Sequence, residues 1–475
     1  KAGLKVSGVL RYDQRPDGSV IEPGVTENDR LIELAWGGVA NVVVAETLFH
    51  LAEQGFWPEA EDRVRQMIEA ILHFADGGFQ VQDGPCRGAW WNGYIVEQRR
   101  FASRYGRAHV ETPNQGFVNY FLYRLWSLGA TRDPDLPRRI EHNCTRFLQS
   151  IERPEGGVEY ARYTDGRTGQ SRFYEDYTRG YACGTAMTAL SWLCAWRLTG
   201  IPDYRQQAKR LFDFLVDETA RNEWRFLEYD TTGADTAAPA WVLIALCEAI
   251  QDLDCPAYRQ AADRTFDLLW ILRYHVQPDM ERYKAKEAVW GGRMLIKGGM
   301  VHGSTPGSRQ GSHAAHIRYD FPLAFEQYWR LTGRSKAYAA MIGYLNFQTW
   351  HQFTRTDLPI GTGTTTEQCS LVWDYVQDTA QIKHSNPLVM LALTPWLQCL
   401  GTNAEITLAQ RPDANSLCLD LHSLGEAPTW LEWDRPARIY DEGELIGPGP
   451  ATRFVLPPRQ RRRLKAIVAC SDSSP

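Results

Sequence analysis

The stretch WRLTGIPDY, residues 196–204, recurs as WRLTGRSKAY at residues 329–338, and a weaker copy lies at residues 123–133. In each copy an apolar run ends at a glycine, which can adopt the positive φ that closes a helix. A short polar turn follows, and then a second amphipathic run begins. The repeat therefore predicts a hairpin of two antiparallel helices joined by a short turn.

Apolar residues on both sides of the first copy have helical spacing. They recur from Met187 to Leu198 at intervals of three and four, and after the turn Ala208, Leu211 and Leu215 do the same. Each helix therefore buries one stripe of side chains. Similar hairpins are predicted at residues 30–75, 115–151, 181–218, 235–273 and 316–352, with a last helix near 385–400.

Long connectors separate these hairpins, whereas the turn inside a hairpin, such as 199–202, is short. The connectors are residues 76–114, 152–180, 219–234, 274–313 and 354–384. Long loops in a compact domain are usually functional. The repeats are too long and irregular for an ordinary solenoid, which favours closure into a ring. We therefore expect a mainly α fold with function on the connectors at one end of the ring.

The two ends of the chain are β-rich. Short strands are predicted at residues 404–409, 416–421, 430–433 and 464–468, and a strand hairpin at residues 4–21. The predicted domains are a helical ring over residues 1–400, including the N-terminal β segment, and a small β-sheet domain over residues 401–475. The basic run 459–463 directly precedes the last strand and is interpreted as a solvated strand edge.

This organisation resembles the (α/α)6-toroid carbohydrate-active enzymes, which include glycoside hydrolases, unsaturated uronyl hydrolases and polysaccharide lyases. The resemblance is architectural and covers most of the chain. It implies an (α/α)6 toroid whose connector loops form an active site for a carbohydrate.

Composition narrows the classes of partner. A net charge of −5 disfavours an electrostatic grip on nucleic acid, and no apolar run is long enough to span a membrane. The ten cysteines are scattered without a CxxC pair, and Cys194 and Cys247 lie in apolar helical stretches, so reduced thiols are expected. We therefore expect a carbohydrate substrate, no nucleic-acid or membrane partner, no cofactor, and a cytoplasmic location, or a periplasmic or secreted one if a leader was removed.

The connectors combine the residue types that bind sugars. Sugar rings stack on aromatic side chains, and their hydroxyls need carboxylates, amides and arginines. Any one of the 17 tryptophans could simply fill the core, but adjacent Trp90 and Trp91 in a Gly-rich loop favour binding. The predicted substrate-binding residues are Trp90, Trp91, Asn114, Tyr174, Arg179, Asp230, Trp290, His302, Arg309, His313, Arg318, Trp373 and Asp374.

Three carboxylates at predicted helix starts are candidates for general acid, base or nucleophile: Glu111, Asp176 and Glu367. A helix N-terminus favours the ionised form, which suits a base. The alternative for each is a helix cap or a salt bridge. These carboxylates predict a glycoside hydrolase that cleaves an oligo- or polysaccharide, with or without uronate units.

The segment from His302 to Asp320 holds three of the eleven histidines. His313 and His316 share a helical face if the next helix has begun there. The absence of HExxH or a cysteine pair disfavours a metal. The alternative reaction is β-elimination on a uronate, with Arg318 neutralising the carboxylate and His316 and Tyr319 moving protons. A non-catalytic carbohydrate-binding ring is the third interpretation.

Overall fold

The fold is taken from a computed structural model. It describes residues 31–34, 41–53, 58–95, 98–102, 109–154, 156–169, 182–221, 237–273, 275, 298–301, 314–316, 320–350, 368–370, 399–400, 404–413, 416–423, 429–441 and 443–468. The predicted N-terminal strand hairpin at residues 4–21 lies outside these residues.

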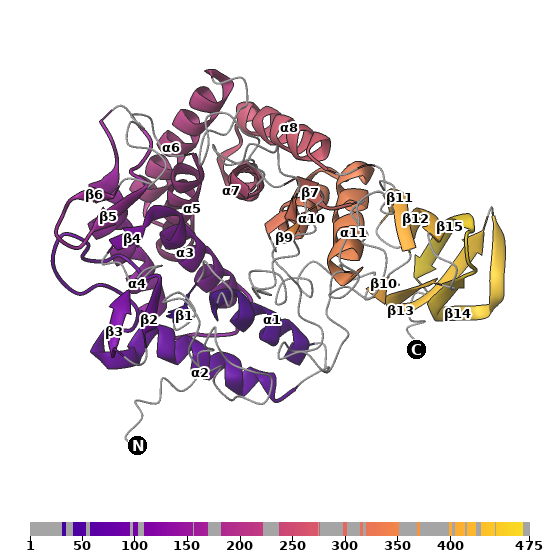
Figure 1. Ribbon diagram of the computed structural model, residues 1–475, viewed down its shortest axis with the longest axis horizontal. Helices are drawn as coiled ribbons and strands as arrows, with labels where there is room; N and C mark the ends of the chain where they lie inside the picture. The colour runs from indigo at the N-terminus through magenta and orange to yellow at the C-terminus, as the bar shows by residue number, and fades with distance from the viewer. Residues whose placement is uncertain are drawn as a thin grey trace.

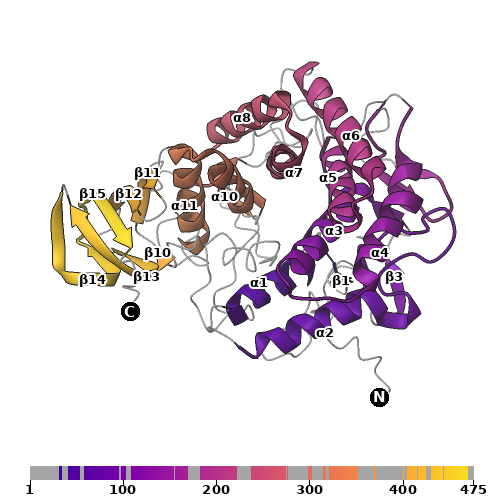
Figure 2. The same cartoon turned by 180° about the vertical axis from the view of Figure 1, so that it is seen from behind.

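Consecutive helical hairpins form the body of the molecule. They pair α1 (Asn41–Glu53) with α2 (Ala60–His73), α3 (Thr112–Ser127) with α4 (Asp135–His142), α5 (Ala182–Thr199) with α6 (Pro202–Arg221), α7 (Ala237–Leu253) with α8 (Pro256–Ile271), and α10 (Asp320–Thr332) with α11 (Ser335–Trp350). Figures 1 and 2 show these pairs following one another around a ring from α1, in indigo, to α11, in orange. The predicted toroid of helical hairpins is confirmed.

The first helix of each pair lies inside the ring, and the second covers it. The inner helices α1, α3, α5, α7 and α10 contact one another in that order. Helix α5 is buried without interruption from Cys183 to Ala195, whereas α6 buries a stripe that includes Ala208, Leu211 and Leu215. The core is therefore a cylinder of inner helices, and outer helices such as α6 cover it with the predicted stripe.

The repeated glycines end their helices as the sequence predicts. Gly200 has φ +72° and Gly333 has φ +67°. The N–H of Gly200 donates to the carbonyl of Trp196, and the N–H of Gly333 donates to the carbonyl of Trp329, each over 2.7 Å. These matching geometries confirm the internal repeat as a helix-ending motif that needs a positive φ.

Connector residues form three small antiparallel sheets, and residues 31–33, which the sequence analysis placed in the first helical hairpin, join one of these sheets as a strand. The sheets are β1 (Leu31–Glu33), β2 (Gly93–Ile95) and β3 (Arg100–Ala102); β4 (His109–Glu111), β5 (Ala161–Tyr163) and β6 (Thr168–Gly169); and β7 (Met300–Val301), β8 (Ala314–His316) and β9 (Gln368–Ser370). Strand β4 ends at Glu111, where α3 begins, and β8 ends four residues before α10. These strands therefore lead into the N-terminal ends of inner helices.

A six-stranded sheet follows the ring. Its strands are β10 (Cys399–Leu400), β11 (Ala404–Asp413), β12 (Ser416–Ser423), β13 (Thr429–Asp441), β14 (Glu444–Leu456) and β15 (Arg461–Val468), in the order β10-β13-β15-β12-β11, with β14 also paired to β13. The predicted β-rich C-terminal part is confirmed. Strand β14 escaped prediction because Gly447-Pro448-Gly449-Pro450 interrupts its apolar pattern.

Two details of the sheet correct the sequence analysis. Residues 399 and 400 form a strand paired with β13, so the predicted last helix does not extend to residue 400; residues 385–398 lie outside the described residues. Strand β15 lies between β13 and β12, so the basic run 459–463 leads into an internal strand rather than an edge, although its Arg461 side chain is exposed.

The sheet packs on the ring beside α11, as Figure 1 shows. Ala437, Ile439 and Leu464 on its buried face belong to the same hydrophobic cluster as the inner helices. The predicted domain boundary at residue 401 stays a prediction. Cys194 and Cys247 are free thiols buried in the core, as expected, and the free thiols also include Cys86, Cys144, Cys183, Cys255 and Cys418. Within the described residues, none of the helices combines the length and apolar character needed to cross a bilayer.

Candidate functional site

Glu111 stands at the junction of β4 and α3. Its backbone is extended, with φ −94° and ψ 135°, because the strand continues up to the first residue of the helix. The side chain is 12% exposed. Asn114 Nδ2 donates a hydrogen bond to Glu111 Oε2 over 3.2 Å. The carboxylate therefore lies at the positive end of the α3 dipole, partly shielded from water, where its ionised form is favoured.

His109 completes a polar group around this carboxylate. Its Nε2 lies 3.5 Å from Glu111 Oε1, and its side chain is 7% exposed. The imidazole packs on the ring of Tyr163 from strand β5, with centroids 5.4 Å apart. Asn114 is 2% exposed, and its Oδ1 has no hydrogen-bond partner among the described residues. A carboxylate, an imidazole and an amide therefore meet at the N-terminus of α3, and such a group can move protons on a bound molecule.

The adjacent tryptophans have different environments. Trp90 is fully buried, and its indole N–H donates to Asn119 Oδ1 on α3 over 2.7 Å. Gln115 binds the backbone N–H and carbonyl of Trp90. Trp91 is partly exposed and stacks on Phe101, with centroids 6.1 Å apart. Because Trp90 has no exposed surface in this structure, the predicted stacking on a sugar is better suited to Trp91.

Two sequence-distant candidate segments pair in one small sheet. His316 on β8 lies opposite Gln368 on β9, the residue after Glu367, and opposite Met300 on β7. Residues 314–316 form a strand, and α10 begins only at Asp320. The condition for a helical face shared by His313 and His316, that the helix has begun by His316, is therefore not met; His313 lies outside the described residues.

The other predicted site residues lie outside the described residues. They are Asp176, Glu367 and Tyr319 among the catalytic candidates, and Tyr174, Arg179, Asp230, Trp290, His302, Arg309, His313, Arg318, Trp373 and Asp374 among the binding candidates. Sequence analysis missed His109, although its position two residues before Glu111 on one strand was a usable signal.

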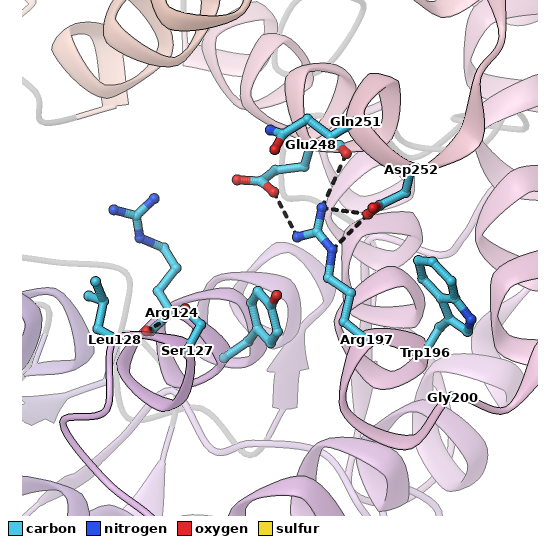
Figure 3. A pocket seen from close by; sticks show the side chains of 10 residues that line it. Arg124, Ser127, Leu128, Trp196, Arg197, Gly200, Glu248, Gln251 and Asp252 are labelled. Carbon is cyan, nitrogen blue, oxygen red and sulfur yellow. Dashed lines mark hydrogen bonds and ion pairs between the residues drawn. The ribbon is translucent and has the colours of Figure 1, made fainter.

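A polar pocket of about 700 Å³ lies at the opposite ends of the inner helices (Figure 3). It is lined by the last turns of α3, α5 and α7 with the residue after α5: Tyr123, Arg124, Ser127, Leu128, Trp196, Arg197, Gly200, Glu248, Gln251 and Asp252. The three helices bring their C-terminal turns to one place and therefore run parallel. From Glu111 to Arg124 the chain advances about 20 Å along α3, so the pocket is separate from the Glu111 group.

The arginines of the pocket are held in ion pairs. Arg197 binds Glu248 Oε2 over 2.7 Å and Asp252 Oδ2 over 2.6 Å, as Figure 3 shows. Arg124 binds Glu46 Oε1 on α1 over 2.5 Å. Burial lowers the pKa of the Arg124 guanidinium, but Glu46 outweighs it and the pKa is raised well above its ordinary value. Both arginines therefore stay charged.

Tyr120 connects these pairs inside the ring. Its hydroxyl donates to Glu248 Oε1 over 2.8 Å and accepts from Arg124 over 3.0 Å and from Gln327 on α10. Burial raises the pKa of Tyr120 well above its ordinary value, so it remains a donor. We call Glu46, Tyr120, Arg124, Arg197, Glu248, Asp252 and Gln327 the axial network. The axial network joins all five described inner helices.

One described group has metal-binding residue types. His73 at the end of α2 lies near Asp133 and Asp135, and the potential ligand atoms lie within 4.8 Å of one another. His73 Nε2 is 2.6 Å from Asp133 Oδ2, and His73 Nδ1 is 3.8 Å from Asp135 Oδ2. The two carboxylates therefore approach different ring nitrogens, which is the geometry of an ion-paired histidine that links two hairpins.

Comparison with known proteins confirms the fold. No protein-family model matches the chain, and no curated protein sequence matches it. A cellobiose 2-epimerase from Bacillus thermoamylovorans superposes with a TM-score of 0.52 at 8% identity, covering 81% of this chain and 92% of that one. A D-mannose isomerase gives a TM-score of 0.51 at 13% identity, covering 81% and 90%.

A cellobiose 2-epimerase from Spirochaeta thermophila also gives a TM-score of 0.51, at 12% identity, covering 80% of this chain and 90% of that one. At these identities the likeness concerns the fold alone. The chain therefore has the architecture of (α/α)6-toroid carbohydrate-active enzymes, as its sequence resemblance implies.

Proposed function

We propose that this protein is a carbohydrate-processing enzyme whose active site lies where the connectors enter the N-terminal ends of the inner helices. The observation that carries the proposal is the group of Glu111, His109 and Asn114, partly shielded from water at the start of α3. The fold supports it, because the solved structures with this architecture include a sugar isomerase and two sugar epimerases.

The first reaction that we propose is glycoside hydrolysis. Glu111 would act as base or nucleophile, since the helix N-terminus favours its ionised form. Hydrolysis needs a second carboxyl group as the acid. Asp176 and Glu367 are the candidates from the sequence, and Gln368 beside Glu367 belongs to a sheet formed by connectors.

A second reaction is favoured by the contact between His109 and Glu111. An imidazole and a carboxylate at this distance can remove a proton from a sugar carbon and return it, which is what isomerisation or epimerisation requires. The three similar structures are those of a D-mannose isomerase and two cellobiose 2-epimerases. Such a reaction needs no second carboxylate, so Glu111 and His109 would suffice as acid and base.

The test is incubation of the full chain with a panel of neutral and uronate-containing glycans, followed by mass spectrometry and chromatography. Hydrolysis adds one water to the summed product mass. Isomerisation or epimerisation keeps the mass and changes the retention time. Elimination keeps the summed mass and creates an ultraviolet-absorbing unsaturated uronate. Because the products differ, one panel separates the three reactions, and a chain that transforms no glycan would overturn the proposal.

The role of Glu111 is tested with Glu111→Gln and a matched variant, Glu61→Gln, at an exposed position of α2. Glu111→Gln should lower kcat about 10²- to 10⁴-fold, as loss of a general acid or base does, while sugar binding persists. Glu61→Gln should leave kcat unchanged. Full turnover in Glu111→Gln would rule out Glu111 as a catalytic group, whereas loss of turnover with retained binding would exclude a purely carbohydrate-binding ring.

A further inference from the structure

The pocket at the C-terminal ends of α3, α5 and α7 has the size of a ligand site. Its volume of about 700 Å³ lies within the usual range for small-molecule pockets. Phe117 and Tyr120, which follow Glu111 along α3, are fully buried and fill the core between the two places. A molecule in the pocket would therefore not touch the Glu111 group, and the pocket requires a separate explanation.

The charges that line the pocket cancel. The lining contains two arginines, Arg124 and Arg197, and two carboxylates, Glu248 and Asp252. Arg197 is engaged by both carboxylates, and Arg124 by Glu46 behind the lining. An anionic or cationic ligand would have to compete with these ion pairs in a half-buried setting, whereas a neutral ligand can add hydrogen bonds and leave the pairs in place.

The lining offers both hydrogen bonds and apolar surface. Glu248 and Asp252 accept hydrogen bonds, and Ser127 and Gln251 can both donate and accept. Tyr123, Trp196 and Leu128 contribute apolar surface. Figure 3 shows Leu128 and Trp196 on different sides of the cavity. This mixture suits a molecule that carries hydroxyls around its edge and apolar C–H groups on its faces, which describes a sugar ring.

The axial network also has unused hydrogen-bond capacity. Glu46 is fully buried, and its Oε2 has no hydrogen-bond partner among the described residues. Gln327 Oε1 is likewise buried and unpartnered within the described part of the chain. An acceptor left unpaired in the core costs about 1–3 kcal/mol, so water or hydroxyl groups that reach the axial network would relieve it.

From these observations we propose that the pocket is a second, non-catalytic binding site for a neutral saccharide unit, at the opposite end of the inner helices from the Glu111 group. The proposal goes beyond the proposed enzymatic reaction and does not depend on which reaction occurs. It predicts that the protein binds a neutral sugar at two places, and that blocking this pocket leaves turnover intact.

The pocket can be blocked from either side by a substitution at an exposed lining position. Gln251→Trp on α7 and Ser127→Trp on α3 each place an indole in the cavity and leave every residue of the axial network unchanged. Gln206→Trp, at an exposed position of α6 outside the pocket, is the matched control for an added tryptophan. Two blocking variants keep the test decisive if one of them fails to fold.

Binding is measured on the full chain in the Glu111→Gln background by calorimetry and saturation-transfer NMR, with D-glucose, D-mannose and cellobiose as neutral probes. D-glucuronate and D-glucosamine serve as charged probes. We expect two classes of site for a neutral probe in Glu111→Gln and in the Gln206→Trp control. We expect one class in each blocking variant, and weaker binding of both charged probes to the pocket.

Unchanged two-site binding in both folded blocking variants would overturn the proposal, as would a single class of site before blocking, or tighter pocket binding of glucuronate or glucosamine. Blocking variants made with Glu111 intact should keep the kcat of the unmodified chain. If blocking abolishes turnover, the pocket is the catalytic site and the second-site proposal is wrong. If Glu111→Gln alone abolishes turnover while blocking changes no binding, the proposed function stands and only the second site fails.

Discussion

Removal of the Tyr120 hydroxyl tests whether the axial network holds the inner helices together. Tyr120→Phe keeps the ring that packs in the core and deletes one hydroxyl, which donates to Glu248 over 2.8 Å and accepts from Arg124 over 3.0 Å. A hydrogen bond to a charged group contributes about 1.5–3 kcal/mol. Because Glu248 keeps Arg197 and Arg124 keeps Glu46, we expect a loss of about 2–4 kcal/mol in the free energy of unfolding rather than the full sum.

The matched control is Tyr258→Phe on the outer helix α8. Its hydroxyl also donates to a carboxylate, Asp213 Oδ1, over 2.7 Å. The Asp213 side chain is 45% exposed, so water can replace the lost bond, and a cost of about 1 kcal/mol is expected. The two variants therefore compare the same chemical change inside the ring and at its surface.

The assay is urea-induced unfolding followed by tryptophan fluorescence and by circular dichroism, with a double-mutant cycle between Tyr120→Phe and Glu248→Gln. Residues within one hydrogen-bond network couple by about 0.5–3 kcal/mol, whereas distant pairs add. Tyr120→Phe combined with Tyr258→Phe should therefore be additive. Equal losses in the two single variants, together with no coupling to Glu248, would refute the structural role of the axial network.

Four further substitutions test what single residues contribute to stability and to activity. Burial raises the pKa of the Glu46 carboxyl, but Arg124 and His50 outweigh burial, and the pKa is lowered from its ordinary value of 4.5. The ionised Glu46 therefore stabilises the fold above pH 4.5, and this contribution is lost as the pH falls through the lowered pKa of the folded state. In urea unfolding, the difference in the free energy of unfolding between the unmodified chain and Glu46→Gln should therefore disappear in acid. Gly116→Ala places a Cβ 2.4 Å from both the backbone oxygen and the Cβ of Met187 on α5. This overlap should outweigh the better helix propensity of alanine and lower the free energy of unfolding by about 1–3 kcal/mol, measured by thermal denaturation. Trp90→Phe removes the hydrogen bond from the indole N–H to Asn119 Oδ1 and should lower the free energy of unfolding by about 1–3 kcal/mol while leaving kcat unchanged. Trp91→Ala should act mainly on substrate binding, with a raised KM and little change in the thermal midpoint.

The hairpins could be predicted because their signals are local. The glycines at 200 and 333 ended their helices, and the apolar stripe through Ala208 and Leu211 identified an outer helix. These features depend on residues within one or two turns of one another, which a single sequence displays directly. Four of the five described hairpins were therefore predicted to within four residues at each end, whereas the hairpin predicted from residue 30 begins only at Asn41, because residues 31–33 form β1.

The connector sheets and the axial network depend on distant residues, and a sequence does not display such contacts. Tyr120 and Glu248 are 128 positions apart, and Gln327 lies 207 positions from Tyr120. In the sequence, Arg124 and Arg197 look like ordinary basic residues in the last turn of a helix. The pocket at the C-terminal ends of the inner helices was missed because it too is formed by distant residues. In addition, the short turns inside the hairpins had suggested that function lies at the other end of the ring.

The direction of the inner helices explains why we place catalysis at Glu111 and not in the pocket, although both contain carboxylates. At the N-terminus of α3 the helix dipole itself favours the ionised carboxylate, which suits the base that we propose Glu111 to be. At the C-terminal ends the dipoles oppose a negative charge, and Glu248 is held there by Arg197 and Tyr120. A carboxylate held in an ion pair with an arginine of another helix is better suited to join the two helices than to transfer protons. The same residue type therefore stands beside His109 and Asn114 at a helix N-terminus at one end of the ring and joins helices at the other.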